Sequence, residues 1–162
     1  MIIDTHCHLP YINYNINNWE DLYINKYSKY LLYHLAKYYG FKVGCKYNDD
    51  LDKFRNDITE KTILNIDQSS LDYAILFAVD GVYDQEGNIK NKESIIYAPN
   101  NLILDLAKKY KKVFPGASVN FNRNDINEEI EYIIENKFVL IKIHPSIQQV
   151  NISDSKYEHI YK

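Results

Sequence analysis

The sequence predicts an α/β fold in which strands alternate with helices and lie parallel in one sheet. Four short segments fit strands, and segments with apolar residues at helical spacing separate them. The second strand segment is an almost unbroken apolar run, which is typical of a strand covered on both faces. These patterns leave two architectures open: an open doubly wound sheet, or part of a (β/α)8 barrel.

The first strand is expected over residues 2–8. Side chains alternate along a strand, so His6 and His8 should share one face with Asp4. Cys7, between the histidines, should point to the other face, which excludes it as a partner of the two imidazoles.

A helical insertion is expected over residues 11–70, between the first and second strands. Within it, aromatic and leucine side chains recur at three- to four-residue spacing over 19–39, which predicts one helix. A second helix is expected over 51–69. The whole chain, residues 1–162, is interpreted as a single domain because no linker or repeat divides it.

The rest of the chain alternates strands and helices. Asn100 is the expected N-cap of the first helix in this part, and another helix is expected to begin near residue 154. The expected elements are strand 73–80, a turn at 85–88, helix 101–112, strand 113–120, helix 125–136 and strand 138–144.

Composition excludes several classes of protein. Of the 162 residues, 46% are hydrophobic, and 19 Lys and Arg face 22 Asp and Glu, so the net charge of −3 argues against a nucleic-acid partner. No apolar run is long enough to span a membrane, and the N-terminus lacks the pattern of a signal peptide. Two cysteines are too few for a disulfide scaffold, so we expect a cytoplasmic protein.

The tripeptide His6-Cys7-His8 is the sharpest chemical signal. Residues i and i+2 of a strand have Cβ atoms about 6.5–7 Å apart on one face, so both imidazoles can reach one metal ion. The pair ends the first strand, where α/β folds place their sites, and Asp4 could orient one imidazole. The alternative is two ordinary surface or capping histidines.

Lys142 and His144 form a second candidate group, on one face at the end of the expected fourth strand. A lysine beside apolar neighbours is costly unless it is paired or used chemically. Lys142 could reach solvent, contact an anionic substrate, or react with CO2 to form a carbamate that bridges metal ions. Three roles are open for His144: it could contact substrate, bind a metal ion or have a structural function. Asp80, which ends the second strand, could bind substrate or form a turn.

Four segments together resemble the amidohydrolase superfamily: IIDTHCHL, FAVDGVYD, PNNLILDLAKKYKKVFPGASVN and VLIKIHPSIQQVN. Within it, they resemble the amidohydrolase-2 group of metal-dependent hydrolases, which includes some decarboxylases. The resemblance covers nearly the whole chain apart from about residues 11–48. It implies that the four strands are the first half of a TIM-type (β/α)8 barrel.

The resemblance also implies a chemistry. His6 and His8 would be the metal ligands of the first strand, with zinc as the expected divalent metal, and Lys142 matches a position that is carbamylated in some relatives. The implied reaction is attack of a metal-activated water on an amide or ester-like bond of a small-molecule substrate. Metal-dependent non-oxidative decarboxylation in the same superfamily is the alternative.

The chain departs from that family in its length. Further histidines from later strands and an aspartate from the eighth strand have no counterpart in these 162 residues. We therefore expect a truncated, catalytically weak chain that self-associates or pairs with a complementing C-terminal half. A non-catalytic remnant that acts as an oligomerising or binding module is the other interpretation.

Overall fold

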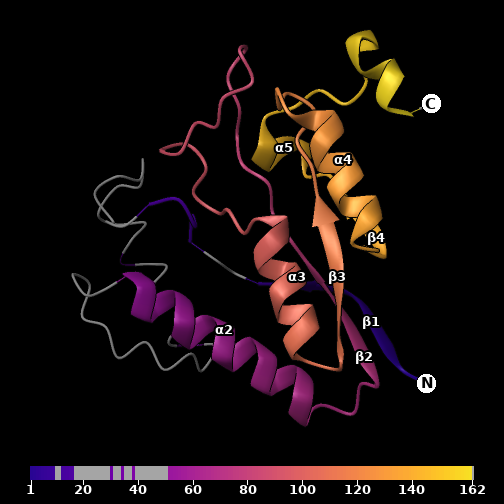
Figure 1. Ribbon diagram of the computed structural model, residues 1–162. Helices are drawn as coiled ribbons and strands as arrows, with labels where there is room; N and C mark the ends of the chain where they lie inside the picture. The colour runs from indigo at the N-terminus through magenta and orange to yellow at the C-terminus, as the bar shows by residue number, and fades with distance from the viewer. Residues whose placement is uncertain (10–11, 17–29, 31–33, 35–37, 39–50, 162) are drawn as a thin grey trace.

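A four-stranded, all-parallel sheet is the centre of the computed structural model, which describes residues 1–9, 12–16, 30, 34, 38 and 51–161. The strand order is β1-β2-β3-β4, and the sheet is curled like half of a barrel (Figure 1). Because the spatial order follows the chain order, the described sheet lacks the reversal of a doubly wound sheet. The strands are β1 (Ile3–His8), β2 (Tyr73–Phe77), β3 (Val113–Ser118) and β4 (Leu140–Lys142).

Three helices cover the outer face of the sheet: α2 (Leu51–Gln68), α3 (Asn100–Lys109) and α4 (Ile126–Glu135). Figure 1 shows α2 and α3 running along the same side of the strands. The apolar sides of the helices pack against side chains of β2 and β3 that point toward the helices. These contacts form two buried apolar clusters. The prediction of parallel strands packed against helices is confirmed.

The helix predicted over 19–39 lies almost entirely outside the described residues. Within it, Tyr30, His34 and Tyr38 are described, and each is helical and exposed. The second predicted helix of the insertion is confirmed as α2, which begins at Leu51 as expected.

Three of the four strands, β2, β3 and β4, end earlier than predicted, whereas β1 ends at His8 as expected. The chain leaves β2 after Phe77, and Val79 instead forms an isolated antiparallel bridge with Ala98. The turn at 85–88 is confirmed, and Gly87 takes a φ of 81° there. A side chain at this glycine would also place its Cβ 2.5 Å from the backbone nitrogen of Asn124, so only glycine fits.

The prediction that Asn100 caps a helix is wrong. Asn100 is the first residue of α3, its side chain makes no capping hydrogen bond, and Pro99 precedes it in extended conformation. Its amide reaches across to β3: Nδ2 donates to the Ser118 carbonyl at 3.0 Å, and Oδ1 accepts from the Ser118 N–H at 2.9 Å. Because Asn100 is buried, it bonds the strand beside it rather than its own helix.

Two elements follow β4. The short helix α5 (Pro145–Gln148) was not predicted, although Pro145 at its start is a common helix-initiating residue. The expected C-terminal helix is present as a 3-10 helix, η2 (Ser155–Tyr161). In the described part of the chain, no helix combines the length and apolar character needed to cross a membrane.

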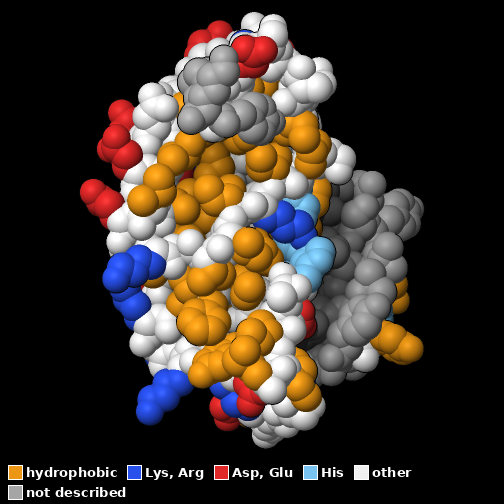
Figure 2. All heavy atoms as spheres, turned by 90° about the vertical axis from the view of Figure 1, so that its right-hand side faces the viewer, with side chains coloured by type: hydrophobic (Ala, Val, Ile, Leu, Met, Phe, Trp, Pro, Cys, Tyr) orange, Lys and Arg blue, Asp and Glu red, His pale blue; other side chains and the backbone are white. Residues whose placement is uncertain are grey.

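The inner, concave face of the sheet is defined by its register. The Cα partners His8, Phe77, Gly116 and Leu140 form one row across the four strands, and Ser118 and Lys142 share the next. Apolar side chains remain exposed on this face, as the broad orange area of Figure 2 shows. They include Ile3, Phe114 and Leu140, which are 39%, 39% and 47% exposed.

Candidate metal centre

His6 and His8 converge at the C-terminal end of β1. Their Nε2 atoms lie 2.9 Å apart, and the ring centroids are separated by 4.9 Å. The HxH spacing on an extended strand therefore aims both imidazoles at the same point, as the sequence predicts.

A bulge changes the first half of this strand. The register with β2 shifts between Asp4 and Cys7, so Ile3 rather than Asp4 lies on the same face as His8. The Asp4 carboxylate accepts a hydrogen bond from the backbone N–H of His6 at 2.9 Å. The expectation that Asp4 shares the histidine face is therefore wrong. Cys7 packs against the outer apolar cluster, away from the imidazoles.

Lys142 completes the group from the opposite edge of the sheet. Its Nζ lies 2.9 Å from Nε2 of His8 and also contacts Nε2 of His6. β1 and β4 are separated by three strand spacings, about 14 Å along a flat sheet, so this contact depends on the curl. We call these three residues the histidine–lysine centre. Figure 2 shows histidine side chains and a basic group gathered on one area of the inner face.

Phe77 of β2 forms the floor of the histidine–lysine centre. Its ring centroid lies 6.2 Å from that of His6, 5.8 Å from that of His8 and 5.5 Å from Nζ of Lys142. Gly116 of β3 makes room for the ring, because a Cβ there would lie 2.6 Å from a Phe77 ring atom. Sequence reasoning did not single out Phe77, since it lies within an ordinary apolar strand.

His144 lies beside the centre, next to His8. Its ring centroid is 5.2 Å from that of His8. Its backbone N–H donates to Oε1 of Gln148 at 2.7 Å, and Gln148 is fully buried and also bonds Ser118 of β3. Helix α5 therefore fixes the backbone of His144 through a side chain four residues later.

The electrostatics in and beside the centre favour neutral imidazoles at His8 and His144. Burial, reinforced by Lys142, His144 and His6, lowers the pKa of His8 to about 4. Burial also lowers the pKa of Lys142, and burial together with Lys142 and His6 lowers that of His144. At neutral pH His8 therefore presents a lone pair, which is the form that binds a metal ion.

The donor set fits a divalent metal only in part. Two imidazole nitrogens directed at one point suit zinc, but zinc sites use three or four protein ligands. Among the described residues, no group of three or more His, Cys, Asp and Glu side chains is close enough to hold an ion. Nζ of Lys142 lies where an ion shared by both imidazoles would sit, so the lysine must withdraw or be modified for the ion to bind.

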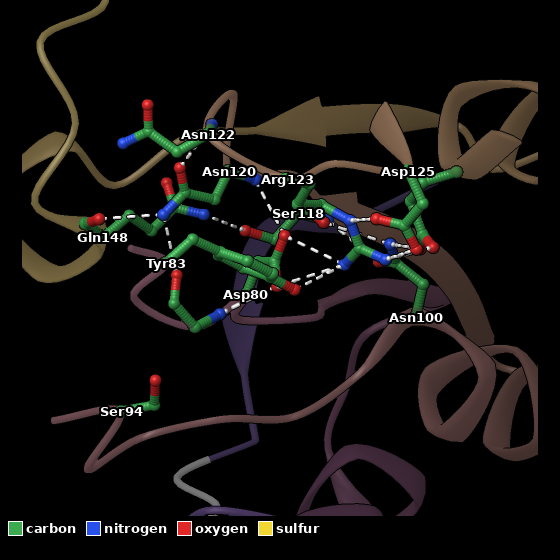
Figure 3. A network of polar contacts seen from close by, with 12 residues as sticks. Asp80, Tyr83, Ser94, Asn100, Ser118, Asn120, Asn122, Arg123, Asp125 and Gln148 are labelled. Carbon is green, nitrogen blue, oxygen red and sulfur yellow. Dashed lines mark hydrogen bonds and ion pairs between the residues drawn. The ribbon is translucent and has the colours of Figure 1, made fainter. Parts of the chain in front are cut away.

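Asp80 lies in a separate buried network with Arg123 (Figure 3). Its carboxylate accepts hydrogen bonds from the backbone N–H groups of Gly81 and Asn120, at 2.8 and 2.7 Å, and from the Tyr83 hydroxyl at 3.0 Å. Burial raises the pKa of Asp80, and Arg123 with the backbone donors opposes that rise. Asp80 therefore anchors the loop after β2 through groups that already occupy its oxygens.

Arg123 joins this network to α4 and was not singled out from the sequence. Its guanidinium is 3.3 Å from Asp80, 2.8 Å from Asp125 and 2.9 Å from Glu129. A cavity of about 280 Å³ lies beside these groups, and Tyr97 and Tyr132 are among its lining residues. The charged groups beside the cavity are paired with one another, so they are less available to a ligand than the side chains of the histidine–lysine centre.

Comparison of the chain with protein-family models, with curated proteins and with solved structures found no match.

Proposed function

We propose that this chain is a metal-dependent hydrolase domain, the first half of a TIM-type barrel, that acts in the cytoplasm on an amide or ester-like bond of a small molecule. In this proposal His6 and His8 hold a divalent ion, with zinc as the first choice. The observation that carries it is the convergence of two imidazoles and a lysine from opposite edges of one parallel sheet, where the strands end.

The residues of the centre have separate roles in the proposed chemistry. A bound divalent ion supplies a Lewis acid that polarises a carbonyl oxygen and makes water a stronger nucleophile. His6 and His8 direct their Nε2 atoms at the ion, and the ring of Phe77 excludes water from below. Lys142 contacts an anionic group of the substrate or, as a carbamate, adds oxygen ligands.

The proposed site needs more ligands than the described residues supply. Two imidazoles hold a zinc ion weakly, because such sites use three or four protein ligands. We propose that the missing ligands and the general base come from a second copy or from a complementing C-terminal half. The chain by itself should then bind metal weakly and turn over substrate slowly or not at all.

Two alternatives remain. Metal-dependent non-oxidative decarboxylation would use the same histidines, so substrate screening has to include both carboxylic acids and amides. The exposed side chains of Phe114 and Leu140 on the inner face favour a second kind of function, a non-catalytic module that binds another chain.

The test is the metal content of purified chain 1–162 after dialysis against zinc, measured by elemental analysis. We expect bound zinc in the wild-type chain and at least a tenfold lower content in His6→Ala/His8→Ala. The matched control is His34→Ala, which removes an exposed helical histidine and should leave the content unchanged. Equal zinc in all three chains would overturn the proposed site.

A further inference from the structure

Two neighbouring histidine rings, with centroids 5.2 Å apart, each have one ring nitrogen that is buried without a hydrogen-bond partner. The two nitrogens are Nδ1 of His8 and Nε2 of His144, and among the described residues neither has a donor or acceptor within reach. Buried polar atoms are nearly always paired, so each of the two requires an explanation.

The contact with Lys142 favours one of the two neutral tautomers of His8. A lysine ammonium has only donors, so Nε2 of His8, 2.9 Å from Nζ, must be the acceptor. The proton of a neutral His8 is therefore on Nδ1, which needs an acceptor of its own. This is also the tautomer in which Nε2 can bind a metal ion.

His144 is positioned to provide that acceptor. The His8 and His144 centroids are 5.2 Å apart, close to the 4.9 Å of the His6–His8 pair, whose nitrogens are 2.9 Å apart. At this ring separation, rotation of either ring or one bridging water would join the two buried nitrogens. The bond from the His144 N–H to Gln148 holds the backbone that carries this ring.

We propose that His144 is a positioning residue for His8: the Nδ1–H of His8 donates to Nε2 of His144, directly or through one water. This bond fixes the tautomer and the ring orientation of His8, so that Nε2 faces the point shared with His6. The importance of the bond for metal affinity rests on the proposed function, whereas the tautomer itself is a property of the metal-free chain.

The first measurement is the His8 tautomer in the metal-free, full chain, from the ¹⁵N and ¹H chemical shifts of its imidazole. His144→Phe keeps a ring but removes the acceptor, and His144→Gln keeps a side-chain oxygen near the position of Nε2. Because the Lys142 contact also favours the Nδ1 proton, the His144 substitutions are made in the Lys142→Met background, where Lys142 no longer decides the tautomer. There we expect His8 to be protonated at Nδ1 in the parent chain and in His144→Gln, and to shift toward protonation at Nε2 in His144→Phe. An unchanged tautomer in His144→Phe would overturn the proposal.

The second measurement is the zinc dissociation constant of the wild-type chain and of the two His144 variants, with urea unfolding to confirm that each is folded. His144→Phe should bind zinc 10- to 100-fold more weakly, the usual effect of losing a partner of a metal-bound histidine, and His144→Gln should recover most of the affinity. Equal weakening in both variants would overturn the positioning role. If the wild-type chain binds no zinc, the proposed function fails, whereas the tautomer measurement still decides the role of His144.

Discussion

Lys142 brings a cationic group to the point that two imidazoles face. Its Nζ contacts Nε2 of both His6 and His8, and the ring of Phe77 lies beneath it. An ammonium there repels a divalent ion, whereas a carbamate at the same side chain would attract one. The state of this single side chain therefore controls whether the centre accepts metal.

Replacing Lys142 by Met tests whether this side chain controls metal binding. In buffer free of bicarbonate, we expect Lys142→Met to bind zinc about tenfold or more tightly. Two unit charges about 4 Å apart repel by ~1 kcal/mol even in water, and the double charge of zinc makes this ~2 kcal/mol. Isothermal titration with zinc measures the change. Weaker binding by the variant under these conditions would contradict the prediction.

Bicarbonate separates the remaining roles of Lys142. If the lysine is carboxylated, added bicarbonate raises the zinc affinity of the wild-type chain and leaves that of Lys142→Met unchanged. If it contacts substrate, bicarbonate has no effect on either chain. Mass spectrometry of the native protein provides an independent check on the carbamate.

His8 makes the folding stability of the metal-free chain depend on pH. Burial, Lys142, His144 and His6 lower its pKa to about 4 in the folded chain, against an ordinary value near 6.5. Between about pH 6.5 and 4 the unfolded chain takes up a proton that the folded chain does not, so stability falls as the pH falls through this window.

The urea midpoint measured from pH 7.5 to 4.5 tests this linkage. We expect the midpoint of the metal-free wild-type chain to fall with pH more steeply than that of His8→Gln, which has no imidazole to protonate. His34→Gln, altered at an exposed position, should keep the wild-type slope. Identical slopes for the wild-type chain and His8→Gln would contradict the assigned pKa.

At the scale of elements, Arg123 ties the loop after β2 to helix α4. Its guanidinium pairs with Asp80, which is 3% exposed, and with Glu129. Asn120 adds a second connection, because its Nδ2 donates to the carbonyls of Gly81 and Gln148, each at 2.8 Å. This buried network aligns the segments that follow β2, β3 and β4, and so it holds the rim on which His144 lies.

Replacing Arg123 should therefore lower the stability of the fold strongly. Arg123→Met leaves Asp80 buried without its cation, and breaking a buried pair costs about 3–5 kcal/mol. Urea unfolding at pH 7 measures the loss. The control is Glu93→Gln, which removes a partly exposed pair with Lys90 and should cost less than about 1 kcal/mol. If Arg123→Met lowers the free energy of unfolding by less than about 1 kcal/mol, the network does not stabilise the fold as proposed.

For the whole molecule, the inner face of the sheet is the surface that we expect another chain to cover. Parallel sheets are almost always covered on both faces, yet Phe114 and Leu140 are 39% and 47% exposed there. Within the described sheet, β1 and β4 each have a neighbouring strand on one side only. Unpaired strand edges next to exposed apolar side chains favour association with another chain.

We expect purified chain 1–162 to self-associate at micromolar concentrations in sedimentation velocity. Leu140→Lys places a charge on the inner face and should shift the chain toward monomer. Ile134→Lys alters a side chain that is 68% exposed on α4, on the other side of the sheet, and should leave association unchanged. A monomer at all concentrations, with cooperative unfolding, would show that the inner face needs no partner.

Local pattern was sufficient for the order of elements and for part of the candidate site. Periods of two and of three to four residues arise from neighbours in sequence, so they located β1 to β4, α2, α3 and α4. The HxH spacing likewise implied that His6 and His8 share a face, because both lie on one strand. Whether these residues bind metal stays a prediction that the zinc measurement tests.

Only the tertiary structure decided which distant residues meet. The curl of the sheet brings Lys142 to His6 and His8, the bulge in β1 moves Asp4 off their face, and burial turns Asn100 from a cap into a partner of β3. Each outcome depends on how strands and helices pack across tens of residues. A sequence records which side chains are adjacent along the chain, whereas strand curvature and the pairing of buried polar groups are set by contacts between elements.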